Sequence, residues 1–364
     1  MPFDPHPAQP SRGRDAGRDR RAVGRWLLAV AGMVWVMVAL GGATRLTGSG
    51  LSIMEWAPLS GVLPPLSEAE WQRLYDLYRT IPQYALVNSD FGLGGFKAIF
   101  WLEWVHRLWG RMIGLAFLLP FLWFWARGRI PPGYHGRLIG LFLLGGMQGA
   151  VGWFMVASGF EADRTSVSPY RLVIHLALAL LLFSALLWTA LGLLRPRGAA
   201  QAGFGPPPGW ATARRAAGLT AMLLVPTLLA GGFVAGLKAG FDYNTFPFMG
   251  GRLVPEGYAA LSPLWRNWTE NIAAVQFDHR LLATLAGLAA LGTALLGRRL
   301  PPGPARQATV LLGGAALLQY ALGVATLLLV VPAWLGTLHQ ACAVALLAAA
   351  LLALHALRRP QPAM

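Results

Sequence analysis

Eight apolar stretches constrain the fold of this chain more than any other feature of its sequence. Each is close to the roughly 20 residues that an α-helix needs to cross a bilayer. Backbone polar groups cannot stay unpaired in lipid, and none of the stretches alternates like a barrel strand, so each is predicted to be a helix. We therefore expect an all-α integral membrane protein with eight transmembrane helices, at about 25–43, 104–126, 137–158, 171–194, 214–236, 279–297, 306–331 and 335–357.

The net charge of +15 does not indicate a nucleic-acid partner, because the basic residues follow a membrane topology. If both termini are cytoplasmic, the tails and inner loops contain many arginines and few acids, whereas most acids fall in the outer loops. This asymmetry is the positive-inside rule. We therefore predict cytoplasmic termini and surroundings of membrane lipid, and we exclude nucleic acid as a partner.

The two halves of the chain read as copies of one four-helix unit. Gly41-Gly42 matches Gly231-Gly232, and each pair precedes a long outer loop. Because a four-helix unit returns to its starting side, both copies share one orientation, and we predict two pseudo-symmetric four-helix bundles. The expected boundaries are a disordered basic tail at 1–24, an N-terminal unit at 25–194, a cytoplasmic linker at 195–213, a C-terminal unit at 214–357 and a cytoplasmic tail at 358–364.

The long outer loops, at about 44–103 and 237–278, are predicted to fold as caps because they contain Trp, Pro and Gly rather than linker residues. The first contains an expected amphipathic helix from Ser67 to Arg79, in which Ser67 precedes Glu70 at the spacing of a capping box. The single cysteine, Cys342, lies inside the last span, so no intramolecular disulfide can form.

Four of the seven histidines, His106, His175, His279 and His339, lie at the outer ends of spans 2, 4, 6 and 8. One intramembrane histidine alone is more often a packing or proton-relay residue. Four histidines in two repeat-related pairs instead favour ligation, because alternate helices of a bundle can present two imidazoles to opposite faces of a flat cofactor. Bis-histidine haem suits this arrangement. Zinc or copper would favour clustered ligands with a carboxylate or thiol among them, so it is the weaker alternative.

Three arginines accompany the predicted ligands. Arg107 and Arg280 directly follow His106 and His279, and Arg111 lies one helical turn deeper. Arginine at this depth costs about 2.5–3.5 kcal/mol unless it finds an anion or reaches the interface. Haem propionates would supply such an anion through bidentate hydrogen bonds. Snorkelling to the interface stays open as the alternative, above all for Arg280.

The halves differ at one informative position. Glu103 lies three residues before His106 on the same helical face, whereas Gln276 occupies the matching place before His279. A carboxyl group beside only one haem indicates that the N-terminal half performs proton-coupled chemistry. The alternative is an interfacial acid near the start of span 2.

These residues resemble haem A synthases of the alphaproteobacterial and mitochondrial type. The resemblance runs from about Gly41 to His355, and its most specific stretches are 41–52 (GGATRLTGSGLS), 103–111 (EWVHRLWGR), 243–247 (YNTFP), 265–268 (WRNW) and 277–280 (FDHR). It implies that haem O binds between His106 and His175, with Glu103 taking part in catalysis. It also implies that His279 and His339 hold haem b.

The implied reaction oxidises the C8 methyl group of haem O to a formyl group by successive hydroxylations, with haem b as the electron relay. The expected partners are haem O and haem A, membrane lipid, haem O synthase, cytochrome oxidase assembly factors and an unidentified electron acceptor; a homo-oligomer stays open. We expect a bacterial inner membrane rather than a mitochondrial one. The alternatives are a cytochrome b that only transfers electrons and a haem transporter, and neither explains the difference between Glu103 and Gln276.

Overall fold

The computed structural model describes residues 12–57, 60–195 and 207–358. Over these ranges the chain is helical, apart from loops and one isolated bridge between Met249 and Arg252. Eight helices are long and apolar enough to cross a membrane, which confirms the predicted number and a multi-pass membrane protein. They are α1 Arg12–Leu46, α4 Leu93–Ala126, α5 His135–Ala157, α6 Pro169–Leu194, α7 Trp210–Gly236, α9 Ile272–Arg298, α10 Pro304–Leu328 and α11 Ala333–Ala356.

The N-terminal boundary differs from the sequence prediction. Residues 12–24, expected to be part of a disordered tail, form the first turns of α1. An ion pair of 2.6 Å between Asp19 and Arg129 ties this extension to the loop after α4, and it helps to hold the extended helix beyond the apolar span. The rest of that predicted tail, most of the 195–213 linker and nearly all of the C-terminal tail lie outside the described residues.

Helices α4 and α9 also begin earlier than predicted. Helix α4 starts 11 residues before the expected span, and Lys97 in this added part contacts Glu68 at 3.1 Å. At the start of α9, the Asn271 side chain accepts hydrogen bonds from two backbone amides of the first turn. His106 and His279 therefore lie well inside their helices instead of at the helix ends.

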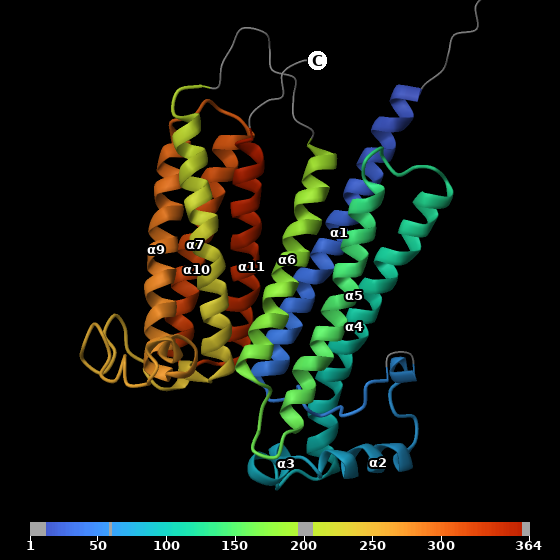
Figure 1. Cartoon of the computed structure of the whole chain (residues 1–364), viewed down its shortest axis with the longest axis vertical. Helices are drawn as coiled ribbons and strands as arrows, with labels where there is room; N and C mark the ends of the chain where they lie inside the picture. The colour runs from blue at the N-terminus through green and yellow to red at the C-terminus, as the bar shows by residue number, and fades with distance from the viewer. Residues whose placement is uncertain (1–11, 58–59, 196–206, 359–364) are drawn as a thin grey trace, which may run out of the picture.

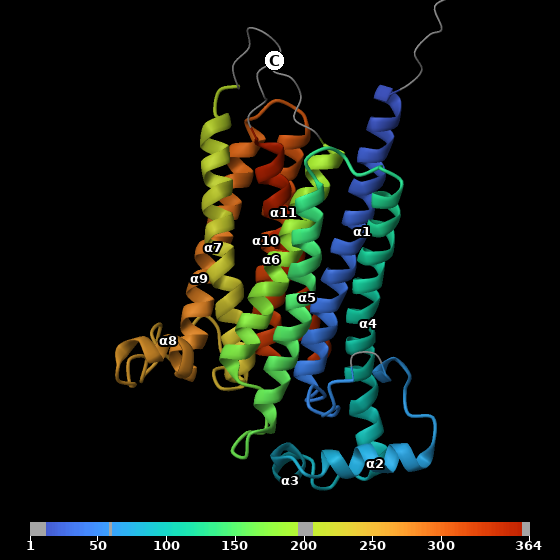
Figure 2. The ribbon, with the colours of Figure 1, turned by 45° about the vertical axis from the view of Figure 1, so that its right-hand side comes forward.

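The described outer loops lie at one end of the long helices, and the first of them forms a cap, whereas a cap in the second loop stays a prediction (Figure 1). Helix α2 (Glu68–Tyr78) lies across the outer end of α4, with the short α3 (Pro82–Val87) beside it (Figure 2). The Ser67 hydroxyl accepts a hydrogen bond from the Glu70 amide at 3.2 Å, which confirms the N-terminal cap. The other short elements are η1 Ser60–Val62, η2 Ser158–Phe160, η3 Ala239–Phe241, η4 Leu264–Arg266 and α8 Asn267–Glu270.

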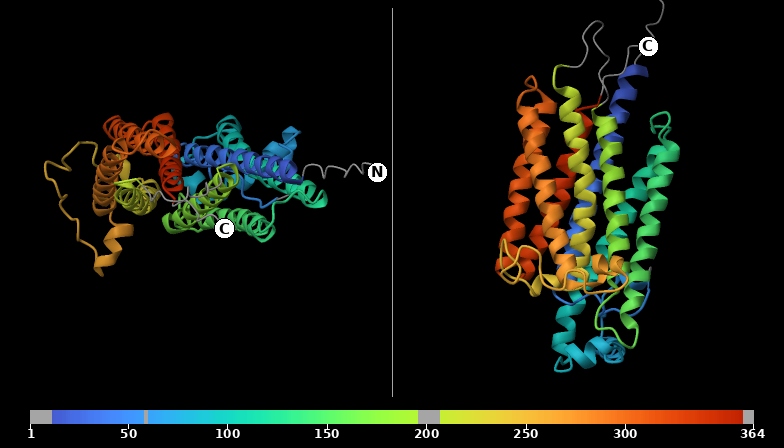
Figure 3. Two further views of the ribbon diagram at one scale, coloured as in Figure 1. Left: turned by 90° about the horizontal axis from the view of Figure 1, so that it is seen from above. Right: turned by 60° about the vertical axis from the view of Figure 1, so that its left-hand side comes forward.

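The eight long helices form two neighbouring groups of four (Figures 1 and 3). In one, α1 packs on α4 and α6, and α5 packs on α6; in the other, α9 packs on α7 and α10, and α11 packs on α10 and α7. Contacts of α1 with α11 and of α6 with α7 join the groups. The described chain begins and ends at one end of these groups, opposite the caps (Figure 1). A twofold relation between the groups stays a prediction.

Candidate functional site

The structure brings the four predicted histidines together in two pairs, one in each half. His106 on α4 and His175 on α6 lie near enough for their charges to influence each other, and so do His279 on α9 and His339 on α11. In the described part of the chain, no three His, Cys, Asp or Glu side chains gather where they could share one ion. Two nitrogen ligands per centre suit an axially ligated haem better than a tetrahedral zinc site.

A glycine from a neighbouring helix lies against each of the four imidazole rings. A Cβ atom built on these glycines would come within 2.9 to 3.3 Å of a ring atom. In the order of the histidines, the glycines are Gly41 on α1, Gly152 on α5, Gly231 on α7 and Gly323 on α10. Each ring therefore has bare backbone on the side of its glycine, and backbone without a side chain permits close approach of a neighbouring group. The sites fit haem in this respect.

Polar neighbours hold three of the histidine rings. The Nδ1 atom of His279 lies 3.1 Å from the backbone oxygen of Thr227, a bond that leaves Nε2 available to a metal. Gln148 approaches Nδ1 of His175 at 3.2 Å, and Gln319 approaches Nδ1 of His339 at 3.0 Å. The sequence prediction did not include these glutamines among the site residues. Their matched places in the repeat, four residues before the glycines that contact the same histidines, were the available signal.

Glu103 is buried, with only 2% of its surface exposed, and both of its carboxylate oxygens are occupied. Its Oε1 atom accepts a hydrogen bond from Arg107 at 2.7 Å within a salt bridge. Its Oε2 atom accepts from the Ser52 hydroxyl at 2.7 Å and from the Ile53 amide at 2.9 Å. The carboxylate thus joins α4 to the segment that follows α1.

Arg107 also fastens the first outer loop to α4. Its guanidinium donates to the backbone oxygens of Ile53 and Glu55, the latter at 2.8 Å. Neither contact was expected from the sequence, which suggested an anion or the interface as partner. Loop carbonyl oxygens instead accept hydrogen bonds from the Arg107 guanidinium. We call Arg107, Glu103 and these loop carbonyls a clamp, because together they join α4 to the loop.

Arg280 makes corresponding contacts in the second half. It donates to the backbone oxygens of Tyr243 at 2.6 Å and Thr245 at 2.9 Å, and to Oε1 of Gln276 at 3.0 Å. Gln276 therefore takes the place of Glu103 in an otherwise similar clamp. It donates to the Ala239 carbonyl oxygen at 2.8 Å. The two clamps differ in charge more than in their hydrogen-bond pattern.

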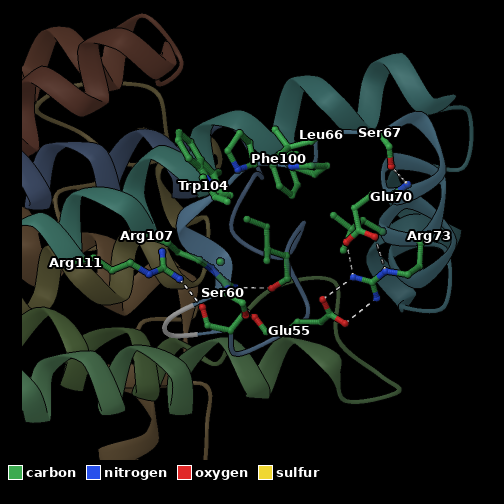
Figure 4. Close-up of a pocket in the computed structure, with 17 residues that line it drawn as sticks. Glu55, Ser60, Leu66, Ser67, Glu70, Arg73, Phe100, Trp104, Arg107 and Arg111 are labelled. Atoms are coloured by element: carbon green, nitrogen blue, oxygen red, sulfur yellow. Dashed lines mark hydrogen bonds and ion pairs between the residues drawn. The ribbon is translucent and has the colours of Figure 1, made fainter.

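A cavity of about 400 Å³ opens between the first outer loop and α4 (Figure 4). Arg107 and Arg111 line one part of it, and Arg111 donates to the Ala57 carbonyl oxygen at 2.8 Å. Another part holds Arg73, whose ion pairs bind α2 to the loop and lower the pKa of the Glu55 carboxyl. The part of the cavity lined by Arg107 and Arg111 can bind a carboxylate ligand through charge-assisted hydrogen bonds.

Comparison with known proteins matches this chain to one family. The profile of the cytochrome oxidase assembly protein family, COX15-CtaA, covers residues 24–351. A heme A synthase from Granulibacter bethesdensis is 60% identical over 341 residues, 94% of this chain and 88% of the relative. Those from Rhodospirillum centenum and Beijerinckia indica are 48% and 47% identical, covering 94% and 98% of this chain and 90% and 98% of the relatives. No solved structure matches the chain.

Proposed function

Because this chain belongs to the cytochrome oxidase assembly protein family, we propose that it is a haem A synthase, which oxidises haem O to haem A. The conversion turns the C8 methyl group of the porphyrin into a formyl group through two hydroxylations and loss of water from the diol. The similar proteins from three bacteria are named for this activity. The paired histidines and their glycine surroundings support two haem sites.

The single observation that carries the proposal is the charge difference between the two clamps. Glu103 and Gln276 occupy matching places beside the two histidine pairs, but only Glu103 brings a carboxylate. Two sites built only to pass electrons would not need this difference. We assign haem O to the site of His106 and His175 and haem b to the site of His279 and His339.

Glu103 acts most simply as a fixed negative charge. Arg107, Ser52 and the Ile53 amide already occupy both oxygens, so accepting a proton would require these bonds to rearrange. A preorganised charge stabilises positive charge that develops during oxidation and needs no such rearrangement. Stabilisation of positive charge therefore agrees better with the contacts of Glu103 than acceptance of a proton does.

The remaining assignments concern binding and location. Haem b supplies one-electron transfer when it is bound, and an acceptor outside the described chain receives the electrons. Arg107, Arg111 and Arg280 are the cationic side chains near the histidine pairs that would hold haem propionates through charge-assisted hydrogen bonds. We place the protein in the bacterial inner membrane with both termini cytoplasmic, where haem O synthase and oxidase assembly factors are its functional neighbours.

The test compares Glu103→Gln with the unaltered protein. Glutamine is the residue that the second half uses, so the variant keeps the Arg107 contact and loses an acceptor for the Ile53 amide, a cost of about 1–3 kcal/mol. Glu103→Ala would leave Arg107 without its carboxylate, at about 3–5 kcal/mol, and is the less specific change.

The unaltered protein would be purified in detergent, and its haems would be extracted and identified by mass spectrometry. We expect haem B together with haem O, its hydroxylated form or haem A. The Glu103→Gln protein should still contain two haems but no haem A. Haem B alone in the unaltered protein would instead indicate an electron-transferring cytochrome b. Normal haem A in the variant would remove Glu103 from the mechanism.

A further inference from the structure

Each half contains two adjacent glycines whose first member faces a histidine of the same half. A Cβ atom on Gly41 of α1 would lie 3.3 Å from Nε2 of His106. A Cβ atom on Gly231 of α7 would lie 3.0 Å from Cε1 of His279. These distances are tighter than ordinary van der Waals contact, so the first glycine of each pair leaves room for the ring.

The second glycine on α1 faces the other half of the molecule. A Cβ atom on Gly42 would lie 2.4 Å from Oε1 of Gln340, the residue that follows His339 on α11. Gly41 and Gly42 therefore span the gap between a ligand of one histidine pair and the helix that carries a ligand of the other.

The second glycine on α7 repeats this arrangement in the opposite direction. A Cβ atom on Gly232 would lie 3.0 Å from Val173 and 3.1 Å from Leu176, the residues on either side of the His175 turn of α6. Each diglycine thus touches a histidine of its own half and the ligand-bearing helix of the other half. Small residues are the usual means by which helices approach closely in membranes.

Hydrogen bonds fix the crossing of α1 and α11. The Gln340 amide donates to the Val38 carbonyl oxygen at 3.0 Å, and the Trp35 indole donates to the Ala341 carbonyl oxygen at 2.8 Å. Side-chain hydrogen bonds of this kind are a usual means of holding membrane helices together. The place of Gln340, and with it the turn of α11 that carries His339, is therefore defined by α1.

We propose that the two diglycines are positioning elements that set the separation and orientation of the two histidine pairs relative to each other. This inference rests on the proposed function, in which the pairs hold two haems. Electron exchange between haems falls steeply as their separation grows, so a tight helix crossing at both ligand helices keeps the exchange fast. Gly42 and Gly232 act through the helices that they contact and are not catalytic residues.

The experiment substitutes Gly42 and uses another glycine of the same helix as its control. Gly42→Ala places a methyl group against the Gln340 amide, whereas Gly32→Ala places one where no atom lies within 4 Å. The double variant Gly42→Ala/Gln340→Ala removes the clash. For each protein we would measure haem content, the EPR spectrum and midpoint potential of haem b, and the rate of electron exchange after flash photolysis.

We expect Gly42→Ala to keep both haems, to change the EPR signal of haem b, and to slow electron exchange several-fold, because the added methyl group moves α1 and α11 apart and electron transfer slows as the separation grows. Gly32→Ala should match the unaltered protein. The double variant should exchange electrons faster than Gly42→Ala because the clash is gone, but it should not regain the full rate because it also lacks the Gln340–Val38 hydrogen bond. Unchanged spectra and exchange in Gly42→Ala, or equal effects in Gly32→Ala, would overturn the inference. An unaltered protein without two haems would instead overturn the proposed function.

Discussion

At the scale of single residues, the two halves share one set of contacts and differ in the charge of one side chain. Arg107 and Arg280 each bind two carbonyls of an outer loop and one side chain four residues earlier on the helix. The side chain is Glu103 in the first half and Gln276 in the second. Charge at this one position distinguishes the two sets of contacts, and this difference was visible in the sequence alone. The loop carbonyls were not predictable, because no pattern in a sequence shows where a distant backbone folds back.

The glutamines beside His175 and His339 offer a prediction at the same scale. The Oε1 atoms of Gln148 and Gln319 are buried and lack a hydrogen-bond partner among the described residues. A half-turn of either amide would let this oxygen accept from the Nδ1–H of the histidine and leave Nε2 for iron. We therefore expect Gln319→Leu to weaken haem b binding by about 10- to 100-fold and to shift its midpoint potential.

Gln148→Leu is the matched control for that change. It should weaken haem O binding and leave the haem b potential unaltered, because it touches only the first histidine pair. Haem titrations and potentiometry of both variants would check this. If each variant disturbed both haems equally, the glutamines would be general packing residues instead.

At the scale of helices, the cap formed by α2 depends on charges. Arg73 donates to Glu55 and Glu70, and these hydrogen bonds lower the pKa of both carboxyls below the ordinary value of 4.5. A carboxyl with a lowered folded-state pKa stabilises the fold fully above its unfolded pKa, and the contribution disappears as pH falls through the folded value. We expect hydrogen-exchange protection of the α2 amides to decrease below about pH 4. Arg73→Gln should abolish this pH dependence, whereas Arg79→Gln should preserve it.

The helix boundaries show what periodicity and hydropathy could not reveal. The apolar core of every span was predictable, because the length needed to cross a bilayer is fixed. The first three turns of α4 were not, since Lys97 and two glycines make them look like loop. In the structure, Lys97 contacts Glu68 and lies 5.1 Å from the centre of the Trp71 ring. Tertiary contacts therefore extended a helix that composition alone would end.

At the scale of the whole molecule, the order of spans and the recurrence of the histidine motifs were predictable, but the joint between the halves was not. The two halves pack closely where Gly42 contacts Gln340 and where Gly232 contacts α6. This packing depends on the absence of a side chain at both glycines. Glycines are common in this chain, and only their neighbours separate those that pack tightly from those, such as Gly32, that do not. The packing that relates the two histidine pairs to each other thus had to come from the structure.

The orientation of the whole molecule can be tested with its single cysteine removed. Cys342 is partly buried in α11, so Cys342→Ala gives a background for introduced thiols. The loop between α5 and α6 lies on the side of α2 and α3, and the loop between α9 and α10 lies on the side of the chain ends (Figure 1). Asp163 in the first loop and Pro302 in the second are exposed. Because Arg298 and Arg299 flank the second loop, the positive-inside rule places it in the cytoplasm. We expect a membrane-impermeant maleimide to label Asp163→Cys in intact spheroplasts and Pro302→Cys only after permeabilisation; the reverse pattern would invert the topology.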